Sequence, residues 1–414
     1  MSASRSHAGP VAAGTAQGAA HVPATVLRVI VAISVCHLLN DMMQSLLPAI
    51  YPDLKANLNL NFEQIGMVTL VNQVTASLLQ PLVGVYADRR PTPLALPLGT
   101  FGTLIGMLVL SVAHTYGVLL IGGAMIGVGS AVFHPEASRV ARMAAGDRHG
   151  FAQSFFQVGG NIGSAVGPLA AALVVVRWGQ SSVAFFALLS LVSATILWNV
   201  ALWYRHHGLE RLRRAAAHHA SVLRMPHGHV RRSLIVLLAL IFSKHVYIAA
   251  ISSFYTFYLI HRFGLSVQSA QLQLFVFLAA CTVGTYLGGP LGDRVGRRAV
   301  IWWSILAPLP LTLLLPYLSS GWTGPAAAMI GLLLSAAFPA IVVYGQELVP
   351  GKVGLISGLF FGFAFGVAGV GAGLLGVLAD HTSIVYVYKL CSFLPLIGLL
   401  AWLLPDLRRS TVAS

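Results

Sequence analysis

Two ionisable side chains lie deep inside apolar stretches of the sequence, where charges are rare. Asp41 is about thirteen residues into the stretch 28–51, and Lys244 is about twelve residues into the stretch 232–260. A charged side chain at the centre of a bilayer costs at least about 2.5–3.5 kcal/mol, so it should face a partner or an aqueous cavity. A carboxylate in such a cavity can take up a proton from one side and release it on the other. We therefore predict that Asp41 is a proton-coupling residue.

Polar residues around these two charges form the predicted substrate site. Asp41 and Lys244 lie at similar depths and can pair with each other. Such a pair either takes part in transport or is a structural ion pair that stabilises packing. A lone cation suits an anionic group on a substrate. The residues predicted to contact the substrate are His37, Asn40, Gln44, Lys244, His245 and Tyr247.

A second polar cluster, His134-Pro135-Glu136, interrupts the apolar stretch 116–138. Proline leaves an upstream carbonyl without its helical hydrogen bond and kinks a helix. We predict that His134 and Glu136 also take part in proton coupling. Two interpretations of Glu136 stay open: it is a second proton site, or it forms an intrahelical ion pair with Arg139.

The elements that carry these residues are predicted to be membrane-spanning helices. Hydrophobic residues make up 57% of the sequence and charged residues 9%, whereas an average soluble domain carries roughly 25% charged residues. A bilayer core requires about 20 apolar residues per helix, and barrel strands would be about 10 residues long and alternating. The composition therefore predicts an all-α membrane protein with twelve spans. The expected spans are 28–51, 63–86, 94–113, 116–138, 150–176, 182–204, 232–260, 268–289, 299–318, 324–347, 352–378 and 383–404.

The basic residues predict the orientation of these spans. With the N-terminus inside, 20 of the 25 Lys and Arg fall on the inner side, and only Lys55, Arg177 and Arg262 fall outside. This distribution follows the positive-inside rule and predicts that both termini are cytoplasmic. The formal net charge of +14 therefore reflects membrane topology. A nucleic-acid-binding function is excluded, because the sequence contains no basic soluble module with interleaved aromatic residues.

A repeated turn divides the chain into two similar halves. Gly84-x-x-x-Asp88-Arg89 recurs 205 positions later as Gly289-x-x-x-Asp293-Arg294. A repeat of that size indicates a duplicated unit. In an apolar chain, two halves indicate a transporter with two pseudo-symmetric six-helix bundles around a central cavity. The predicted divisions are a disordered cytoplasmic tail (1–24), an N-terminal bundle (25–204), a basic cytoplasmic linker (205–231), a C-terminal bundle (232–404) and a cytoplasmic tail (405–414).

The second copy of the turn, residues 289–298 (GPLGDRVGRR), resembles the signature loop of the major facilitator superfamily at every position. The first copy, residues 84–91, lacks the later glycine and the basic pair. The stretches that resemble the fosmidomycin-resistance exporters of that superfamily are 37–48, 78–84 and 133–161. The resemblance implies a proton-coupled antiporter that exports small drugs, such as fosmidomycin-like phosphonates, by alternating access. The alternative is a proton-coupled symporter that imports a small organic anion or a sugar.

The resemblance also implies that the two repeated turns form a gate. Asp88 would face the start of the eleventh helix near Gly351-Lys352, and Asp293 the start of the fifth helix near Arg148. A helix start carries about +0.5 charge, and a nearby carboxylate is stabilised by roughly 0.3–1 kcal/mol. Such contacts form only when the inner side is closed, so they favour an outward-open state. The predicted gating residues are Gly84, Asp88, Arg89, Gly289, Asp293, Arg294, Gly296, Arg297 and Arg298.

Small residues recur along one face of the expected fifth helix. Gly163-x-x-x-Gly167-Pro168 partly resembles the antiporter motif of drug exporters, although alanine replaces the later glycines. Small residues allow two helices to approach closely. The residues predicted to pack against a neighbouring helix are Gly159, Gly163, Gly167 and Pro168.

The sequence predicts no cofactor and no metal site. Cys36, Cys281 and Cys391 lie far apart within apolar stretches, and the six histidines of the linker are irregularly spaced with no cysteine among them that would complete a site. No ATP-binding loop, H-E-x-x-H or Gly-x-Ser-x-Gly motif is present, so an enzyme is not expected. The expected partners are a small-molecule substrate, protons and the lipid bilayer. We expect a monomer in the bacterial inner membrane.

Overall fold

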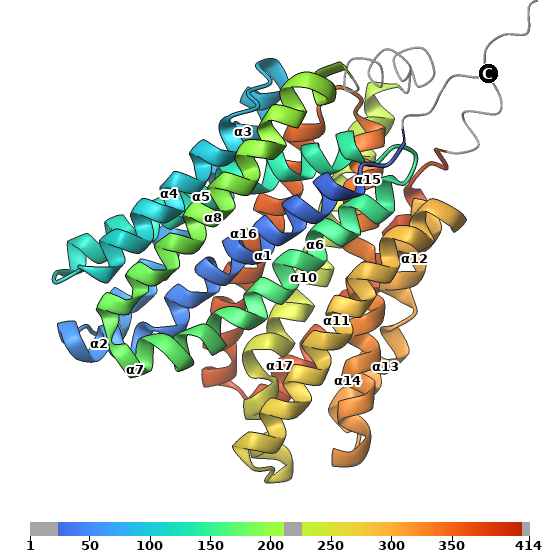
Figure 1. Ribbon diagram of the computed structural model, residues 1–414. Helices are drawn as coiled ribbons and strands as arrows, with labels where there is room; N and C mark the ends of the chain where they lie inside the picture. Colours follow the sequence, from blue (N-terminus) through green and yellow to red (C-terminus); the bar gives the residue numbers. More distant parts are fainter. Residues whose placement is uncertain (1–23, 211–225, 408–414) are drawn as a thin grey trace, which may run out of the picture.

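The computed structural model describes residues 24–210 and 226–407, which form helices and their connections without any strand (Figure 1). Eleven helical stretches in these ranges are long and apolar enough to cross a bilayer, and Ala95–Ser111 is a shorter apolar helix. Together they match the twelve predicted spans. The predicted tail before residue 24, the linker segment 211–225 and the tail from residue 408 lie outside the described residues.

The helices of the first half pack mainly on one another, and α1 lies against α5, α6 and α8. The fifth span is α6 with its continuations η1 and α7, and the sixth runs from η2 to η3. The elements are α1 (Leu27–Ala49), α2 (Tyr51–Leu58), α3 (Phe62–Arg89), α4 (Ala95–Ser111), α5 (Tyr116–Ala144), α6 (His149–Ala170), η1 (Ala171–Val175), α7 (Val176–Trp178), η2 (Gln180–Val183), α8 (Ala184–Trp203) and η3 (Tyr204–Gly208).

The second half repeats this arrangement with more interrupted helices. Pro308 lies between α12 and α13, and Pro339 lies in the first turn of α15, where a missing backbone N–H costs no helical hydrogen bond. The elements are α10 (His227–Phe263), α11 (Val267–Val295), α12 (Arg297–Leu306), α13 (Leu309–Leu314), η4 (Leu315–Tyr317), α14 (Ser320–Ser335), α15 (Ala337–Leu348), α16 (Val353–His381), α17 (Ile384–Cys391) and η5 (Leu394–Leu403).

Helical structure extends into the predicted linker from both sides. The sixth span continues through η3 to Gly208, and α10 begins at His227. The sequence indicated a later start for this helix, because its first residues are polar and basic. Hydropathy marks where a helix enters lipid, and it does not mark where the hydrogen-bonded backbone begins.

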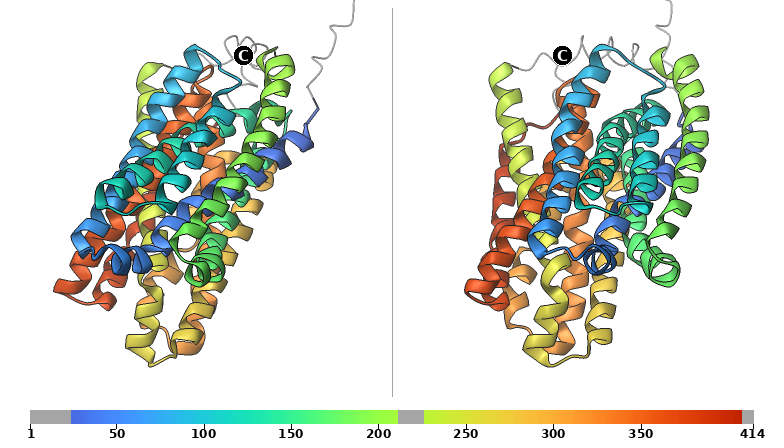
Figure 2. Two further views of the ribbon diagram at one scale, coloured as in Figure 1. Left: turned by 60° about the vertical axis from the view of Figure 1, so that its left-hand side comes forward. Right: turned by 90° about the vertical axis from the view of Figure 1, so that its left-hand side faces the viewer.

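The two halves touch along two seams, α3 against α16 and α6 against α11 (Figure 2). Both seams are lined by glycine at their closest points. A Cβ atom at Gly354 would lie 2.8 Å from the carbonyl oxygen of Gly84, and one at Gly150 would overlap the carbonyl of Gly289. Figure 1 shows α6 and α7 leaning away from α11 toward the end remote from these glycines. The halves are therefore held together at one end of the molecule, which we call the basic end because it carries Arg89, Arg294 and their neighbours.

Within the first half, the glycines of α6 allow it to lie directly on α1. A Cβ atom at Gly159 would overlap the carbonyl of Ser34, and one at Gly163 would overlap the carbonyl of Leu38. Gly167 contacts α1 in the same way one turn further along. The predicted close packing of these glycines is therefore present, and the neighbouring helix is α1.

The contact at Gly163 predicts a specific loss of stability. Gly163→Ala places a methyl group against the main chain of Leu38, and overpacking of this kind costs typically about 1–3 kcal/mol. We expect a lower apparent Tm of the detergent-solubilised protein. Gly373→Ala is the matched control, because a Cβ atom at Gly373 meets nothing within 4 Å. Equal melting temperatures for the two variants would contradict the packing argument.

Candidate functional site

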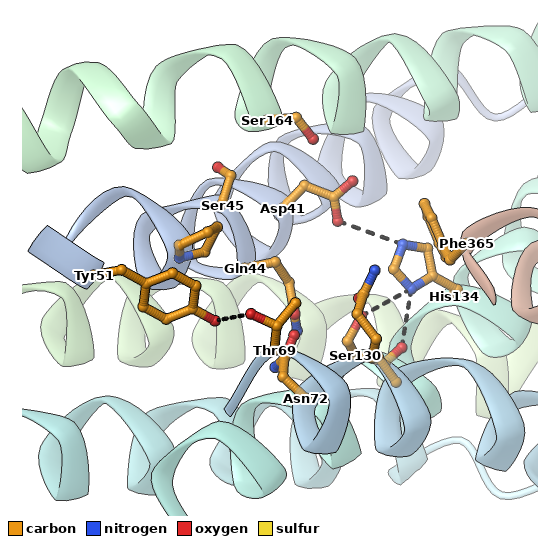
Figure 3. Close-up of a pocket in the computed structure, with 13 residues that line it drawn as sticks. Asp41, Gln44, Ser45, Tyr51, Thr69, Asn72, Ser130, His134, Ser164 and Phe365 are labelled. Carbon is orange, nitrogen blue, oxygen red and sulfur yellow. Dashed lines mark hydrogen bonds and ion pairs between the residues drawn. The ribbon is translucent and has the colours of Figure 1, made fainter. Parts of the chain in front are cut away.

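Asp41 lies between two histidines that come from different helices. His37 precedes Asp41 by one turn of α1, and its Nε2 atom lies 3.3 Å from Oδ2 of the carboxylate. α5 carries His134, whose Nε2 atom lies 3.4 Å from Oδ1 (Figure 3). The two Nε2 atoms are 3.2 Å apart. All three residues are buried, with Asp41 8%, His37 2% and His134 1% exposed.

The other ring nitrogen of each histidine is held by a main-chain carbonyl. Nδ1 of His37 lies 2.8 Å from the carbonyl oxygen of Phe156, and Nδ1 of His134 lies 3.0 Å from that of Ser130. A carbonyl only accepts hydrogen bonds, so these contacts place a proton on each Nδ1. In the neutral rings, both Nε2 atoms are then acceptors that face the carboxylate and each other. Three converging acceptors repel one another, and a cation between them, of which a proton is the simplest, would remove this repulsion.

The cluster borders a polar cavity of about 230 Å³ that runs along the first half. Asp41 and His134 line its inner part, and Tyr51 and Thr69 line its part remote from the basic end (Figure 3). Gln44 also lines it and donates a hydrogen bond of 2.9 Å to the carbonyl of Ile126. The cavity gives Asp41 the polar surroundings that a carboxylate in an apolar helix requires.

The expected ion pair between Asp41 and Lys244 is wrong for this conformation. Asp41 contacts His37 and His134 and accepts a hydrogen bond of 2.9 Å from Asn40. The prediction failed because His134 lies 97 positions from His37 in the sequence, and nothing in their spacing shows that α1 and α5 bring them together.

Lys244 lies in the second half without a carboxylate partner among the described residues. It is 5% exposed, and its Nζ atom lies 4.8 Å from the ring centroid of Phe338. The ring of His245 contacts the same phenylalanine at 4.8 Å, and its Nδ1 atom lies 3.0 Å from the carbonyl of Ile241. The face of an aromatic ring attracts an ammonium group, so Phe338 helps to hold the buried charge of Lys244.

Tyr247 is not placed where the sequence suggested. Its side chain is 1% exposed and belongs to the apolar core of the second half with Tyr255 and Tyr258. It therefore contributes to packing in this conformation and does not line the polar cavity beside Asp41. The sequence gives the depth of Tyr247 along α10, and it does not show which neighbouring helices the ring meets.

Phenylalanines that the sequence analysis did not single out connect the two polar sites. The ring of His134 contacts Phe361 at 5.4 Å and Phe365 at 5.0 Å, and Phe361 contacts Phe338 at 5.2 Å. Phe365 also lines the cavity beside Asp41. These rings of α15 and α16 thus form a continuous path from the histidine of the first half to the amine of the second.

Both repeated aspartates cap a helix start in the opposite half. Asp88 accepts hydrogen bonds from the backbone N–H groups of Gly354 at 2.9 Å and Leu355 at 2.7 Å. Asp293 accepts from those of Gly150 at 2.8 Å and Phe151 at 2.9 Å. The first N–H groups of a helix have no partner within the helix, and the carboxylates satisfy them. The contacts expected for the two turns are present, and they join the halves at the basic end.

Arg139 connects the first of these contacts to Glu136. Its guanidinium contacts the Asp88 carboxylate, and its Nη1 atom lies 3.8 Å from Glu136 and 3.4 Å from the hydroxyl of Tyr204. The intrahelical pair is therefore present, and α5 continues as one helix through Pro135. Glu136 is fully buried, and no described residue donates a hydrogen bond to its carboxyl oxygens. Two carboxylates thus share one guanidinium, which is itself buried together with Glu136.

The remaining gate residues hold the other seam or lie at its surface. Arg297 contacts Asp293 at 3.1 Å and Glu347 at 3.1 Å, and Arg298 donates to the carbonyl of Trp402 at 3.0 Å. Gly296 has φ +105°, a backbone conformation that other residues rarely adopt, which explains the glycine of the motif. The arginines of the two Asp-Arg pairs are exposed at the basic end.

A polar network across the interface was not predicted. The hydroxyl of Ser138 in α5 donates to Gln153 at 2.9 Å and lies 3.0 Å from that of Ser357 in α16. Gln346 donates to Ser357 at 2.9 Å and lies 3.2 Å from Ser138. The sequence gives no sign of this network, because serine and glutamine are common in helices. The structure shows it because the packing of the two halves brings the four side chains together.

A sequence model of the Major Facilitator Superfamily matches residues 33–372. The chain belongs to this superfamily. It is 53% identical over 377 residues to the fosmidomycin resistance protein of Escherichia coli (strain K12), covering 91% of this chain and 92% of that protein. It is 41% identical over 387 residues to an uncharacterised MFS-type transporter, YfnC, of Bacillus subtilis (strain 168), covering 92% and 94%.

Solved structures of the major facilitator superfamily share the fold at low sequence identity. The human organic anion transporter MFSD10 matches with a TM-score of 0.70 at 15% identity, covering 92% of this chain and 99% of that one. A single-residue variant of the E. coli fucose:proton symporter FucP matches with a TM-score of 0.67 at 14% identity, covering 90% and 97%. These likenesses confirm the predicted all-helical fold, and membership of the superfamily confirms that the chain is a transporter rather than an enzyme.

The cap at Asp88 predicts how the basic end of this transporter opens. Asp88→Asn removes one acceptor and the charge that Arg139 contacts. Hydrogen bonds to charged groups contribute about 1.5–3 kcal/mol, and about 1.4 kcal/mol is a factor of ten. We expect a thiol introduced by Ser154→Cys, which is buried beside Gly289, to react with a permeant maleimide about tenfold faster in the Asp88→Asn background.

The matched control is Asp53→Asn in α2, on the opposite end of the molecule from the caps. It removes a carboxylate of the same kind and should leave the labelling rate unchanged. The buried native cysteines give the background rate, measured without Ser154→Cys. An unchanged rate for the Ser154→Cys thiol in the Asp88→Asn background would show that the cap does not hold the basic end closed.

Proposed function

We propose that this transporter exports small anionic drugs, including fosmidomycin-like phosphonates, in exchange for protons. The observation that carries this proposal is the cluster of Asp41, His37 and His134, in which three acceptors converge at the wall of a polar cavity. Such a cluster binds a proton in the middle of the membrane. The 53% identity to the fosmidomycin resistance protein of E. coli supports the substrate class.

The closed basic end supports an outward-facing state. The positive-inside rule places the basic end in the cytoplasm, and the caps at Asp88 and Asp293 join the halves there. The cavity at Asp41 extends toward Tyr51 and Thr69, on the opposite side of the membrane. In this state protons reach the cluster from outside, where they are more concentrated.

Glu136 is proposed as the second proton position, between the cluster and the gate. It lies two residues from His134 and shares Arg139 with Asp88. A proton on Glu136 removes its charge, and Asp88 is then the one carboxylate that still attracts the guanidinium, which also contacts the Tyr204 hydroxyl. The charge state of Glu136 therefore changes the strength of the contact that holds the cytoplasmic side closed.

Lys244 and His245 are proposed to bind the acidic group of the drug. A phosphonate offers several oxygen acceptors to an ammonium group, and such charge-assisted hydrogen bonds are stronger than neutral ones. Lys244 lies over Phe338, which the path of rings connects to His134. An anion bound at Lys244 in the second half is thus connected to the proton site of the first half by a chain of packed aromatic side chains.

The proposal is tested in inside-out membrane vesicles whose lumen is made acidic. Wild-type protein should accumulate fosmidomycin in the lumen against its gradient, because the lumen corresponds to the outside of the cell. Asp41→Asn removes the carboxylate of the cluster and should reduce accumulation to the level of vesicles without the transporter. Asp53→Asn is the control, because it also removes a carboxylate, but one that lies in α2 outside the cluster.

Two outcomes would overturn the proposal. Full gradient-driven accumulation by Asp41→Asn would remove this carboxylate from proton coupling. Accumulation in right-side-out vesicles with acid outside, and none in inside-out vesicles, would indicate a proton-coupled importer.

A separate prediction concerns Lys244. Lys244→Gln removes the cation and should raise the half-saturating concentration of fosmidomycin about tenfold or more, since hydrogen bonds to charged groups contribute about 1.5–3 kcal/mol. Lys389→Gln is the control, because Lys389 is exposed in α17 and lies 5.3 Å from the Tyr317 ring. The measurement is initial uptake in inside-out vesicles. An unchanged half-saturating concentration would place the anion site elsewhere.

A further inference from the structure

We propose that His37, Asp41 and His134 form a binding site for a divalent transition-metal cation of the Zn²⁺ class, which competes with the proton. The inference goes beyond the proposed function, because binding requires no transport. It starts from the repulsion between the acceptor atoms of the cluster, which a bound proton would also remove. Two ring nitrogens and a carboxylate face one another, and the Asn40 amide donates to the carboxylate at Oδ1. A cation with open coordination positions would remove the repulsion between the carboxylate and the two rings.

The spacing of the donor atoms fits such an ion. Their separations are 3.2 Å between the two Nε2 atoms and 3.3 and 3.4 Å from these atoms to the carboxylate oxygens. Zn²⁺ binds histidine nitrogen and carboxylate oxygen at about 2.0–2.2 Å in tetrahedral sites, which places neighbouring ligands about 3.3–3.5 Å apart. Each histidine faces a different carboxylate oxygen, so a bidentate carboxylate, or a rotation of the Asp41 side chain that presents one oxygen to both rings, would complete the site without movement of a helix.

The surroundings of the two histidines are those of metal ligands. A ligating histidine usually donates its other ring N–H to a carbonyl or carboxylate, which fixes the tautomer and the ring orientation. Phe156 and Ser130 supply these carbonyls. The ring of His37 also stacks on that of Phe156 at 4.1 Å. Both Nε2 lone pairs are thus aimed at the position where an ion would lie.

Access and chemistry limit which ions fit. Asp41 and His134 line the polar cavity, from which an ion can enter and a water molecule can fill the fourth position. Two imidazoles and one carboxylate favour Zn²⁺, Co²⁺ and Ni²⁺, whereas Mg²⁺ and Ca²⁺ prefer oxygen ligands. Among the described residues, this is the group of His, Cys, Asp and Glu side chains whose donor atoms come within 4.8 Å of one another.

Gly160 of α6 keeps this space open. A Cβ atom there would lie 2.5 Å from Nε2 of His37 and 2.7 Å from Oδ2 of Asp41. The absence of a side chain at this position therefore allows the two donor groups to adopt their present geometry. Gly160→Ala should disturb the site while it leaves all three ligands in the chain.

The test is Co²⁺ and Zn²⁺ binding to the full-length protein, purified in detergent through a tag without histidines. The six histidines between residues 206 and 229 are replaced by glutamine in every sample, because the linker is the other histidine-rich segment. Co²⁺ should give the intense visible absorption of a four- or five-coordinate N,O site, and Zn²⁺ should abolish it. Calorimetry should show one Zn²⁺ per chain and release of protons into the buffer, since the ligands must lose theirs.

Each ligand variant should weaken Zn²⁺ binding by more than about tenfold, since even partners outside the coordination shell contribute about 10–100-fold. The variants are His37→Gln, His134→Gln and Asp41→Asn. His245→Gln is the matched control, because it is a histidine of α10 outside the cluster. Gly160→Ala should weaken binding as well. Size-exclusion profiles identify any variant that fails to fold.

The inference is overturned if the protein with the unchanged cluster gives no Co²⁺ absorption, or if His134→Gln and His245→Gln bind Zn²⁺ equally well. The first result needs no variant of the cluster, so misfolding cannot obscure it. The experiments distinguish a failure of the metal-site inference from a failure of the proposed export function. Absence of metal binding, together with loss of gradient-driven accumulation in Asp41→Asn, would remove the metal site and leave proton coupling supported.

Discussion

The arrangement of the site depends on how a buried carboxylate is stabilised within an apolar helix. Asp41 is surrounded by His37 and His134, whose Nδ1 atoms are committed to main-chain carbonyls, so the carboxylate meets two acceptors instead of a permanent cation. A fixed positive charge at this point would neutralise Asp41 permanently. Imidazoles that need an additional proton make the charge of the site depend on what is bound, which is the property that a coupling site in a membrane requires.

The same principle recurs where the halves meet. Asp88 and Glu136 both depend on Arg139, and the first carboxylate also caps the start of α16. A change in the charge of Glu136 therefore acts on a contact between the halves without a direct bond between Glu136 and the other half. Asp293 caps α6 in the mirrored position, supported by Arg297.

Much of the fold could be predicted from the sequence, because hydropathy, basic residues and a repeated turn act over long stretches of chain. The caps at Asp88 and Asp293 followed from the resemblance of that turn. The site could be predicted only in part. Asp41 stood out as a charge among apolar residues, but its partner depended on which helices adjoin. Sequence depth suggested Lys244, whereas the packing of α1 against α5 brought in His134.

The seam between α3 and α16 has a consequence for the speed of opening. Along it, Gly358 and Gly362 lie directly on the main chain of α3, where a Cβ atom on either would overlap the carbonyl of Gln80 or Ser77. Interlocked side chains must change rotamer before two surfaces can separate. Two backbones in direct contact need no such rearrangement, so we expect the resistance of the two halves to separation to come mainly from the ionic caps at one end.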